Sequence, residues 1–302
     1  MLLSKDERRA VGIVYMRQAV GKFLRSLLAY SSECRLWYRM YVASFPRCVG
    51  PLLRNWLGRR WYRLLSEQEI LESRASDTVF VFGSGYSIND ISDEEWTEIS
   101  RFDTISFRDF PRQSFIRAGY HLTAEVDDLQ EYAARLRENP LYDSTLFVVQ
   151  GGFSAINGNE LIGRRMLPEG RAIYRFRRKA RGRYEPPSQS LANGLVHGFS
   201  SVMSVVNFAY LMRWKQIVLV GIDLYDKRYF WLGPDEGRAY EKSGLKYDSR
   251  FETANEIVDA LGKWREIFEE VGVELFVYNP RSLLTQALPV YSLPVAAKRQ
   301  QE

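Results

Sequence analysis

The chain has 302 residues, of which 46% are hydrophobic and 14% aromatic, and its net charge at pH 7 is +5. This length and apolar content fit one large folded domain, with or without an appendage, and exclude a disordered chain. Two cysteines, two histidines and no C-x-x-C pair argue against a zinc module, and the cysteines suggest a reducing compartment. The mild positive charge favours anionic partners such as nucleotides, phospholipid headgroups or acidic glycans.

Residues 1–60 concentrate the positive charge, with 12 Lys and Arg against three acids, interleaved with bulky apolar side chains. The segment contains no apolar run long enough to span a bilayer and no secretory signal pattern. A basic, aromatic-rich helical region is typical of attachment to an anionic membrane surface. A helical hairpin packed on the main domain stays open, whereas nucleic-acid binding is not predicted, because no nucleic-acid motif accompanies the charge. The residues expected at the headgroups are Lys22, Arg25, Arg35, Trp37, Arg39, Arg54, Trp56, Arg59 and Trp61.

From residue 76 onward, apolar strand-like segments alternate with helix-like ones. We expect strands over 78–82, 102–107, 120–126, 145–150, 216–221 and 274–278, and helices over 93–100, 127–138, 195–214 and 251–271. The arginine-rich stretch 164–183 has little apolar periodicity and is expected to be an exposed or mobile loop. This alternation predicts an α/β fold, a Rossmann-like parallel sheet sandwiched by helices. The expected organisation is a helical region over 1–75, a nucleotide-binding domain over 76–290 and a disordered tail over 291–302.

The most informative segment is 77–89, where an apolar run ends in Gly83, Ser84 and Gly85 before a helix-like stretch. A glycine turn at this place presents bare backbone N–H groups, and the next helix adds its positive end, so a phosphate-bearing ligand is predicted. The strict G-x-G-x-x-G pattern is not met, because Ile88 stands at the third glycine position. An ordinary tight strand-to-helix turn therefore stays open.

Two further segments carry polar side chains at places where ligands bind in such folds. Ser200 and Ser201 begin the long apolar helix, where hydroxyl groups either cap the helix or bind phosphate oxygens. Asp223 follows the apolar strand 216–221, and ligands of open α/β sheets lie beyond the carboxyl ends of the strands. Tyr225 and Tyr229 put two phenols near the same place. A carboxylate that merely caps the next turn stays open as an alternative for Asp223.

These segments together resemble the bacterial lipooligosaccharide sialyltransferases. Residues 83–90 (GSGYSIND) resemble the glycine turn of that family, and residues 200–225 resemble its Thr-Ser helix and the strand ending in Gly-Ile-Asp-Phe-Tyr. Residues 279–282 (NPRS) lie where the family has a Pro-x-Ser segment. The same arrangement of segments is shared by a wider group. It comprises Kdo-type core-sugar transferases and proteins related to pterin pyrophosphokinases and flagellin-modifying transferases. The resemblance covers residues 78–283 in pieces, and GIDLY is its most specific part.

The resemblance implies a single nucleotide-binding domain of variant GT-A type that transfers sialic acid, Kdo or another acidic nonulosonate from a CMP-activated donor. The acceptor would be a cell-surface glycan or a lipid-linked molecule, without metal or cofactor, at the inner face of the cytoplasmic membrane. It implies that the nucleotide is bound by Gly83, Ser84, Gly85, Ser87, Ser200, Ser201 and Asp223, and that Tyr225 and Tyr229 stabilise the departing phosphate. Phenol O–H donors and a helix N-terminus stabilise such charge without a metal.

The chain departs from that family at its general base, a His before the last helix that has no counterpart here. Asp248 or Glu252 in the corresponding segment, or His197 beside the serine pair, are the candidate bases. Arg108 or Asp109 stands where the family has an Asn after its second strand, so the donor sugar stays open.

The alternatives to a glycosyltransferase are a non-catalytic nucleotide-binding scaffold of an envelope-glycan complex and a diphosphokinase-like enzyme. The missing His favours the scaffold, and the lack of an evident acidic cluster for Mg-ATP disfavours the kinase. The acceptor, the linkage and the formation of a homo-oligomer stay open.

Overall fold

The computed structural model describes residues 45–123, 126, 128–152, 155–179, 185–225, 228–232 and 253–293. The chain divides into two compact units, Met1–Gly50 and Pro51–Glu302. In the first unit the described residues are 45–50, which begin helix α2 (Phe45–Gly58). The predicted headgroup contacts of residues 22–39 lie outside the described residues.

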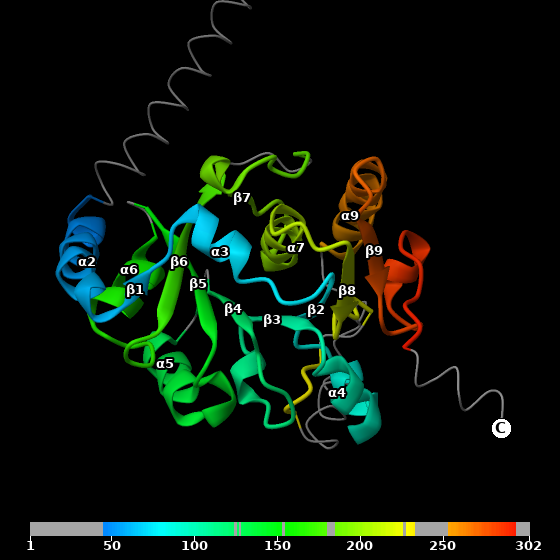
Figure 1. Ribbon diagram of the computed structural model, residues 1–302, viewed down its shortest axis with the longest axis horizontal. Helices are drawn as coiled ribbons and strands as arrows, with labels where there is room; N and C mark the ends of the chain where they lie inside the picture. The colour runs from blue at the N-terminus through cyan, green and yellow to red at the C-terminus, as the bar shows by residue number, and fades with distance from the viewer. Residues whose placement is uncertain are drawn as a thin grey trace, which may run out of the picture. The chain divides into compact units, whose positions relative to one another are not determined.

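The second unit is built on a parallel sheet with strand order β1-β6-β5-β4-β3-β2-β8-β9, and β7 pairs with β6 outside this series (Figure 1). The strands are β1 (Arg63–Leu64), β2 (Thr78–Phe82), β3 (Asp103–Phe107), β4 (Tyr120–Thr123), β5 (Leu146–Gly151), β6 (Ala172–Lys179), β7 (Leu195–Val196), β8 (Gln216–Val220) and β9 (Glu274–Val277). All pairings between these strands are parallel. This architecture confirms the predicted Rossmann-like α/β fold.

Helices cover both faces of this sheet (Figure 1). On one face lie α3 (Glu67–Glu72), α7 (Ser201–Leu211) and α9 (Ala254–Glu269), and on the other lie α4 (Asp93–Ile99), α5 (Leu129–Glu138) and α6 (Ile156–Gly163). Because side chains alternate along a strand, β2 contributes Val79 and Val81 to the first face and Phe80 and Phe82 to the second. Both faces of the central strands are therefore covered, as the continuous apolar character of β2 and β8 requires.

Short 3-10 helices connect several of these elements. They are η2 (Arg59–Trp61), η3 (Tyr86–Asp90), η4 (Phe110–Arg112), η5 (Pro140–Tyr142), η6 (Leu191–Asn193) and η7 (Leu283–Gln286). Among the helices of the described residues, none combines the length and the apolar run that crossing a bilayer requires.

The boundaries of the folded unit differ from those expected from composition. The unit begins at Pro51 rather than at residue 76, because β1 pairs with β6 and Ile70 of α3 is buried in the core. At the other end, Val290 bridges to Val277 and Leu293 is buried, so residues 291–293 are packed rather than part of a disordered tail. Residues 294–302 lie outside the described part of the chain.

The arginine-rich stretch 164–183 is not simply a loop, because residues 172–179 form β6 between β1 and β5. Tyr174 and Phe176 enter the core on one face of the sheet, while Arg175 and Arg177 alternate with them on the other. The predicted helix over 195–214 is also shorter than expected. Residues 195–196 pair with β6 as β7, and α7 begins only at Ser201.

A polar network is buried between the sheet and α5. The His121 Nδ1 lies 2.7 Å from the Ser106 hydroxyl, and its Nε2 is hydrogen bonded to the Tyr132 hydroxyl. The Tyr142 hydroxyl donates to Ser106 Oγ over 3.1 Å. Burial lowers the pKa of His121 to about 3, so the ring is neutral at pH 7. It also raises the pKa of Tyr132 and Tyr142, so both phenols stay protonated.

We expect His121 to make folding stability depend on pH. Its folded pKa of about 3 lies below the ordinary value of the unfolded chain, about 6.5, so between these pH values the unfolded chain binds more protons. Above pH ~6.5 the neutral His121 ring should therefore not lower the free energy of unfolding. Below this pH the free energy of unfolding should fall with acidification, by up to about 1.4 kcal/mol per pH unit. Urea denaturation at a series of pH values measures this slope, which should be reduced in a His121→Gln variant. An identical slope in both proteins would contradict the assignment.

Candidate functional site

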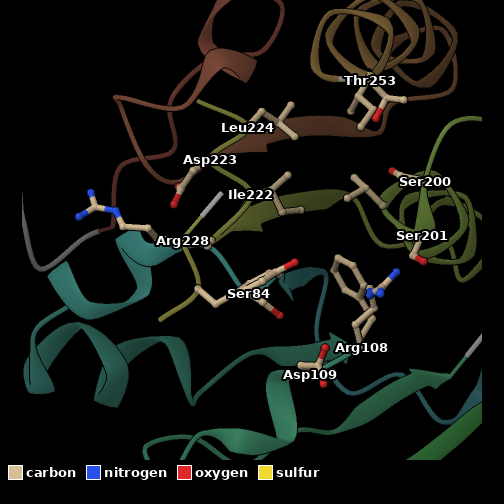
Figure 2. Close-up of a pocket in the computed structure, with 17 residues that line it drawn as sticks. Ser84, Arg108, Asp109, Ser200, Ser201, Ile222, Asp223, Leu224, Arg228 and Thr253 are labelled. Carbon is tan, nitrogen blue, oxygen red and sulfur yellow. The ribbon is translucent and has the colours of Figure 1, made fainter. Parts of the chain in front are cut away.

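A cavity of about 350 Å³ opens at the carboxyl ends of β2, β3 and β8 (Figure 2). The chain passes from β2 to β3 on one side, whereas β8 adds on the other side of β2, so the strand order reverses at this place. Ligands of open α/β sheets bind at such a switch point. The lining is formed by residues 83–85 after β2, 107–109 at the end of β3, 221–224 and 228–229 after β8, 200–202 at the start of α7, and Thr253 and Ile257 at the start of α9.

The glycine turn after β2 forms one wall of this cavity, but the backbone N–H groups of its two glycines are occupied. The Gly83 N–H donates to the Val220 carbonyl and the Gly85 N–H to the Gly221 carbonyl, each over 2.8 Å. The expectation that these N–H groups are bare is therefore wrong, and the short η3 rather than an α-helix follows the turn. A Cβ on Gly83 would lie 2.4 Å from the Gly221 carbonyl oxygen. The glycines permit close approach of two backbones.

Asp223 holds this wall in place. Its carboxylate is buried and accepts hydrogen bonds from the Ser87 N–H (3.0 Å), the Ser87 hydroxyl (2.5 Å) and the Asn279 side-chain amide (2.8 Å). The Ser282 hydroxyl donates to the carbonyl of Ile222 over 2.7 Å. Asp223 touches the cavity but is already bonded to three donors, and Ser87 does not line the cavity. Both residues therefore position the loops around the site.

The opposite wall is the N-terminus of α7, where donors remain available. Ser200 is the N-cap, but its side chain makes no capping hydrogen bond, and its Oγ is buried without a partner. Ser201 and Val202 continue the lining in the first turn of the helix, where their N–H groups have no partner within the helix, whereas the Met203 N–H donates to the Ser200 carbonyl. The macrodipole adds partial positive charge at this end. In Figure 2, Arg108 lies on the same side of the cavity as Ser200 and Ser201.

Two cavity residues adopt a left-handed backbone that side chains other than glycine rarely tolerate. Arg108 has a φ of 53° directly after β3, and Leu224 has a φ of 62° after β8. Such strained positions occur preferentially at functional sites, where the surrounding structure holds them. At Arg108 this conformation accompanies a cationic side chain at the carboxyl edge of the sheet.

The remaining predicted residues separate into three groups. Tyr229 lines the cavity and stacks on Trp231, with ring centroids 4.6 Å apart and an interplanar angle of 3°. Tyr225 is not among the lining residues, and neither is His197, whose Nδ1 lies 3.1 Å from the Ser204 hydroxyl on α7. The candidate bases Asp248 and Glu252 lie outside the described residues.

Sequence reasoning missed four polar residues that line the cavity. Arg228 places its guanidinium 4.4 Å from the centre of the Tyr86 ring, and Thr253 is the N-cap of α9. Arg108 and Asp109, which were noted only as a departure from a family pattern, bring a guanidinium and a carboxylate to the end of β3. Their position just after a buried strand was the available signal, because every strand of a parallel sheet ends at this edge.

Compared with known proteins, the chain matches no family model and no curated protein sequence. The fold and cavity define an α/β protein with a cavity at a topological switch point, the place where ligands of such folds bind. Within the described residues, no group of three or more His, Cys, Asp or Glu side chains is arranged to hold a metal ion.

We expect Asp223→Asn to destabilise the protein. The NH2 group of the new side chain would replace one carboxylate oxygen, so a donor would face either the Ser87 N–H, which now bonds Oδ2, or the Asn279 amide, which now bonds Oδ1. Hydrogen bonds to charged groups contribute about 1.5–3 kcal/mol each, so a loss of this order is expected in urea denaturation. Asp109→Asn is the matched control, because Asp109 lines the same cavity and forms only a 3.8 Å ion pair with Arg112. Equal stability of the two variants would refute the positioning role of Asp223.

Proposed function

We propose that the chain is a glycosyltransferase that moves an acidic sugar from a CMP-activated donor to a hydroxyl group of a glycan or lipid-linked acceptor. The observation that carries the proposal is the N-terminus of α7, which opens into the switch-point cavity with the Ser200 hydroxyl buried and unpartnered. A helix N-terminus with a nearby cation suits a phosphate group. The choice of CMP and of an acidic sugar rests on the resemblance described above.

The cavity has the size and donor set that such a ligand needs. Its volume of about 350 Å³ lies within the range of roughly 300–1,000 Å³ typical of small-molecule sites. Arg108 supplies a guanidinium for the phosphate oxygens, and guanidinium groups bind phosphate through paired, charge-assisted hydrogen bonds. Tyr229, stacked on Trp231, also lines the cavity and pairs through its backbone with Gly85 of the glycine turn.

In the proposed reaction, an acceptor hydroxyl oxygen attacks the anomeric carbon while the bond from that carbon to the phosphate oxygen breaks. The bonding electron pair leaves with the phosphate of CMP, and the acceptor proton passes to a carboxylate base. The N-terminus of α7, Arg108 and Tyr229 stabilise the charge that develops on phosphate, and each such donor typically contributes about 10²–10³ in rate. Asp109 is the base candidate among the described lining residues, because the Asp223 carboxylate is already bonded to three donors. Asp248 and Glu252 stay predictions.

The nucleotide is tested by thermal stability in the presence of CMP, UMP, GDP and ATP. CMP should raise the melting temperature without added divalent cations, and EDTA should not reverse the effect, because ligand binding to the folded state stabilises it. Arg108→Gln should weaken CMP binding about tenfold or more, since a charge-assisted hydrogen bond contributes about 1.5–3 kcal/mol. Arg101→Gln is the matched control, because Arg101 is exposed and paired with Glu98 at the end of α4. A strict requirement for Mg²⁺ or Mn²⁺ would sink the proposal.

The leaving-group role is tested by Tyr229→Phe, which removes only the phenol oxygen. We expect kcat to fall about tenfold or more, with a smaller change in donor affinity, because the hydrogen bond strengthens as charge develops in the transition state. Tyr225→Phe is compared with it, since the resemblance assigns the same role to both tyrosines. A loss of kcat in Tyr229→Phe but not in Tyr225→Phe would agree with the cavity lining, which includes Tyr229 and not Tyr225. Full turnover in the double variant would exclude the leaving-group role.

A non-catalytic nucleotide-binding scaffold is the second candidate. It is favoured by the position of His197, which contacts Ser204 and does not belong to the cavity lining. Release of CMP from its sugar nucleotide separates the candidates, because a transferase slowly hydrolyses its donor and a scaffold binds it unchanged.

A further inference from the structure

Helix α2 exposes an apolar face that the proposed reaction does not use. Leu53, Trp56 and Leu57 are 59%, 62% and 57% exposed. Their spacing of three and four residues puts them on one side of the helix. The other side is packed on α6, where the Asn55 side-chain amide donates to the side-chain oxygen of Asn159 over 3.0 Å.

The orientation of this face is fixed by tight packing. A Cβ on Gly58 would lie 2.5 Å from the Ile162 carbonyl oxygen, and a Cβ on Gly163 would lie 2.7 Å from the carbonyl carbon of Arg54. Arg54 and Arg164 both pair with Glu160 and neutralise it. Because the two helices touch at backbone distance, α2 cannot turn its apolar side inward.

A tryptophan held by arginines continues this face beyond the end of α2. Trp61 is 36% exposed, and the Arg165 guanidinium carbon lies 3.5 Å from the centre of its ring. Arg60 approaches the same ring at 5.4 Å. Arg165 adopts a left-handed φ of 56° to reach this position. We call Leu53, Trp56, Leu57 and Trp61 the α2 surface.

Arg59 lies close to Trp61 in the sequence and, like Arg177, is in electrostatic contact with Arg175, and we call these three cations the arginine cluster. Arg175 and Arg177 project from one side of β6, and the Arg175 Nε is buried without a hydrogen-bond partner. Burial and the charges of Arg59 and Arg177 lower the pKa of Arg175. No carboxylate among the described residues forms an ion pair with any of the three. The cluster thus has the charge and the free donors to bind an anion.

We propose that the α2 surface and the arginine cluster dock this protein on an anionic membrane. The apolar side chains enter the headgroup layer, and Arg59 and Arg177 bind lipid phosphates. Exposed Trp and Leu next to arginines are the composition that partitions into this layer. A second copy of the chain fits less well, because a symmetric contact on this face would bring the two arginine clusters together.

The test measures binding of the full-length chain to equimolar phosphatidylglycerol–phosphatidylcholine vesicles by flotation at low and high salt. We expect binding to the anionic vesicles that weakens with salt and is much reduced for pure phosphatidylcholine. A Trp56→Ala/Leu57→Ala variant should bind at least tenfold more weakly, and Arg59→Gln and Arg177→Gln about fivefold more weakly each. Val271→Ala and Arg101→Gln are matched exposed controls outside this face and should bind as the parent does.

Several results would overturn the proposal. The first is absence of binding at low salt, and the second is equal binding by all variants, which would assign attachment to residues 1–44 alone. A Trp56→Ala/Leu57→Ala variant that keeps full binding but becomes less stable or loses self-association would show that protein covers this face. Glycerol phosphate tests for binding of free anions. If it displaces the chain from vesicles as effectively as high salt does, and Trp56 and Leu57 contribute nothing to binding, the arginine cluster is a site for free anions. CMP binding is measured in parallel on each variant, so failure of docking and failure of the proposed reaction are separate outcomes.

Discussion

The candidate site depends on the hydrogen bonds that the buried carboxylate of Asp223 accepts. This carboxylate joins the loops that follow β2, β8 and β9 by accepting hydrogen bonds from Ser87 and Asn279. A buried carboxylate is stable only when donors compensate its lost hydration, and here three donors do so. The glycines beside it let the β2 and β8 backbones meet at hydrogen-bond distance. One wall of the cavity is therefore organised before any ligand arrives.

In the function we propose, this arrangement moves anion recognition away from the place where Rossmann-like folds commonly put it. The turn after β2 gives its Gly83 and Gly85 donors to the end of β8 and the residue that follows it, whereas the start of α7 keeps an unpartnered hydroxyl and the N–H groups of Ser201 and Val202. The strained Arg108 brings a cation to the same cavity. The wall held by Asp223 and the wall with available donors thus come from different segments, the glycine turn and the N-terminus of α7. A ligand between them would make more polar contacts with α7 than with the glycine turn.

The sequence was sufficient for features that depend on local pattern. Continuous apolar runs predicted β2 and β8. It was insufficient where a distant segment decides the outcome. The arginines of β6 suggested an exposed loop, but Tyr174 and Phe176, on one face of that strand, pack in the hydrophobic core. No local pattern shows that β8 will bond the turn after β2, that His197 faces Ser204, or that Arg108 adopts a positive φ.

The parallel sheet also fixes the distance between the arginine cluster and the cavity. Register places Arg175 and Arg177 of β6 just beyond the level at which β2 ends in its glycine turn, so the arginine cluster and the cavity share one edge. Four strand intervals separate β6 from β2, about 19 Å at the usual inter-strand spacing. Hydrogen-bonded strands do not slide apart, so this distance is constant. An acceptor whose lipid end stays at the arginine cluster would reach the cavity only if its glycan part spans that length, and the sheet would thereby select acceptors by size.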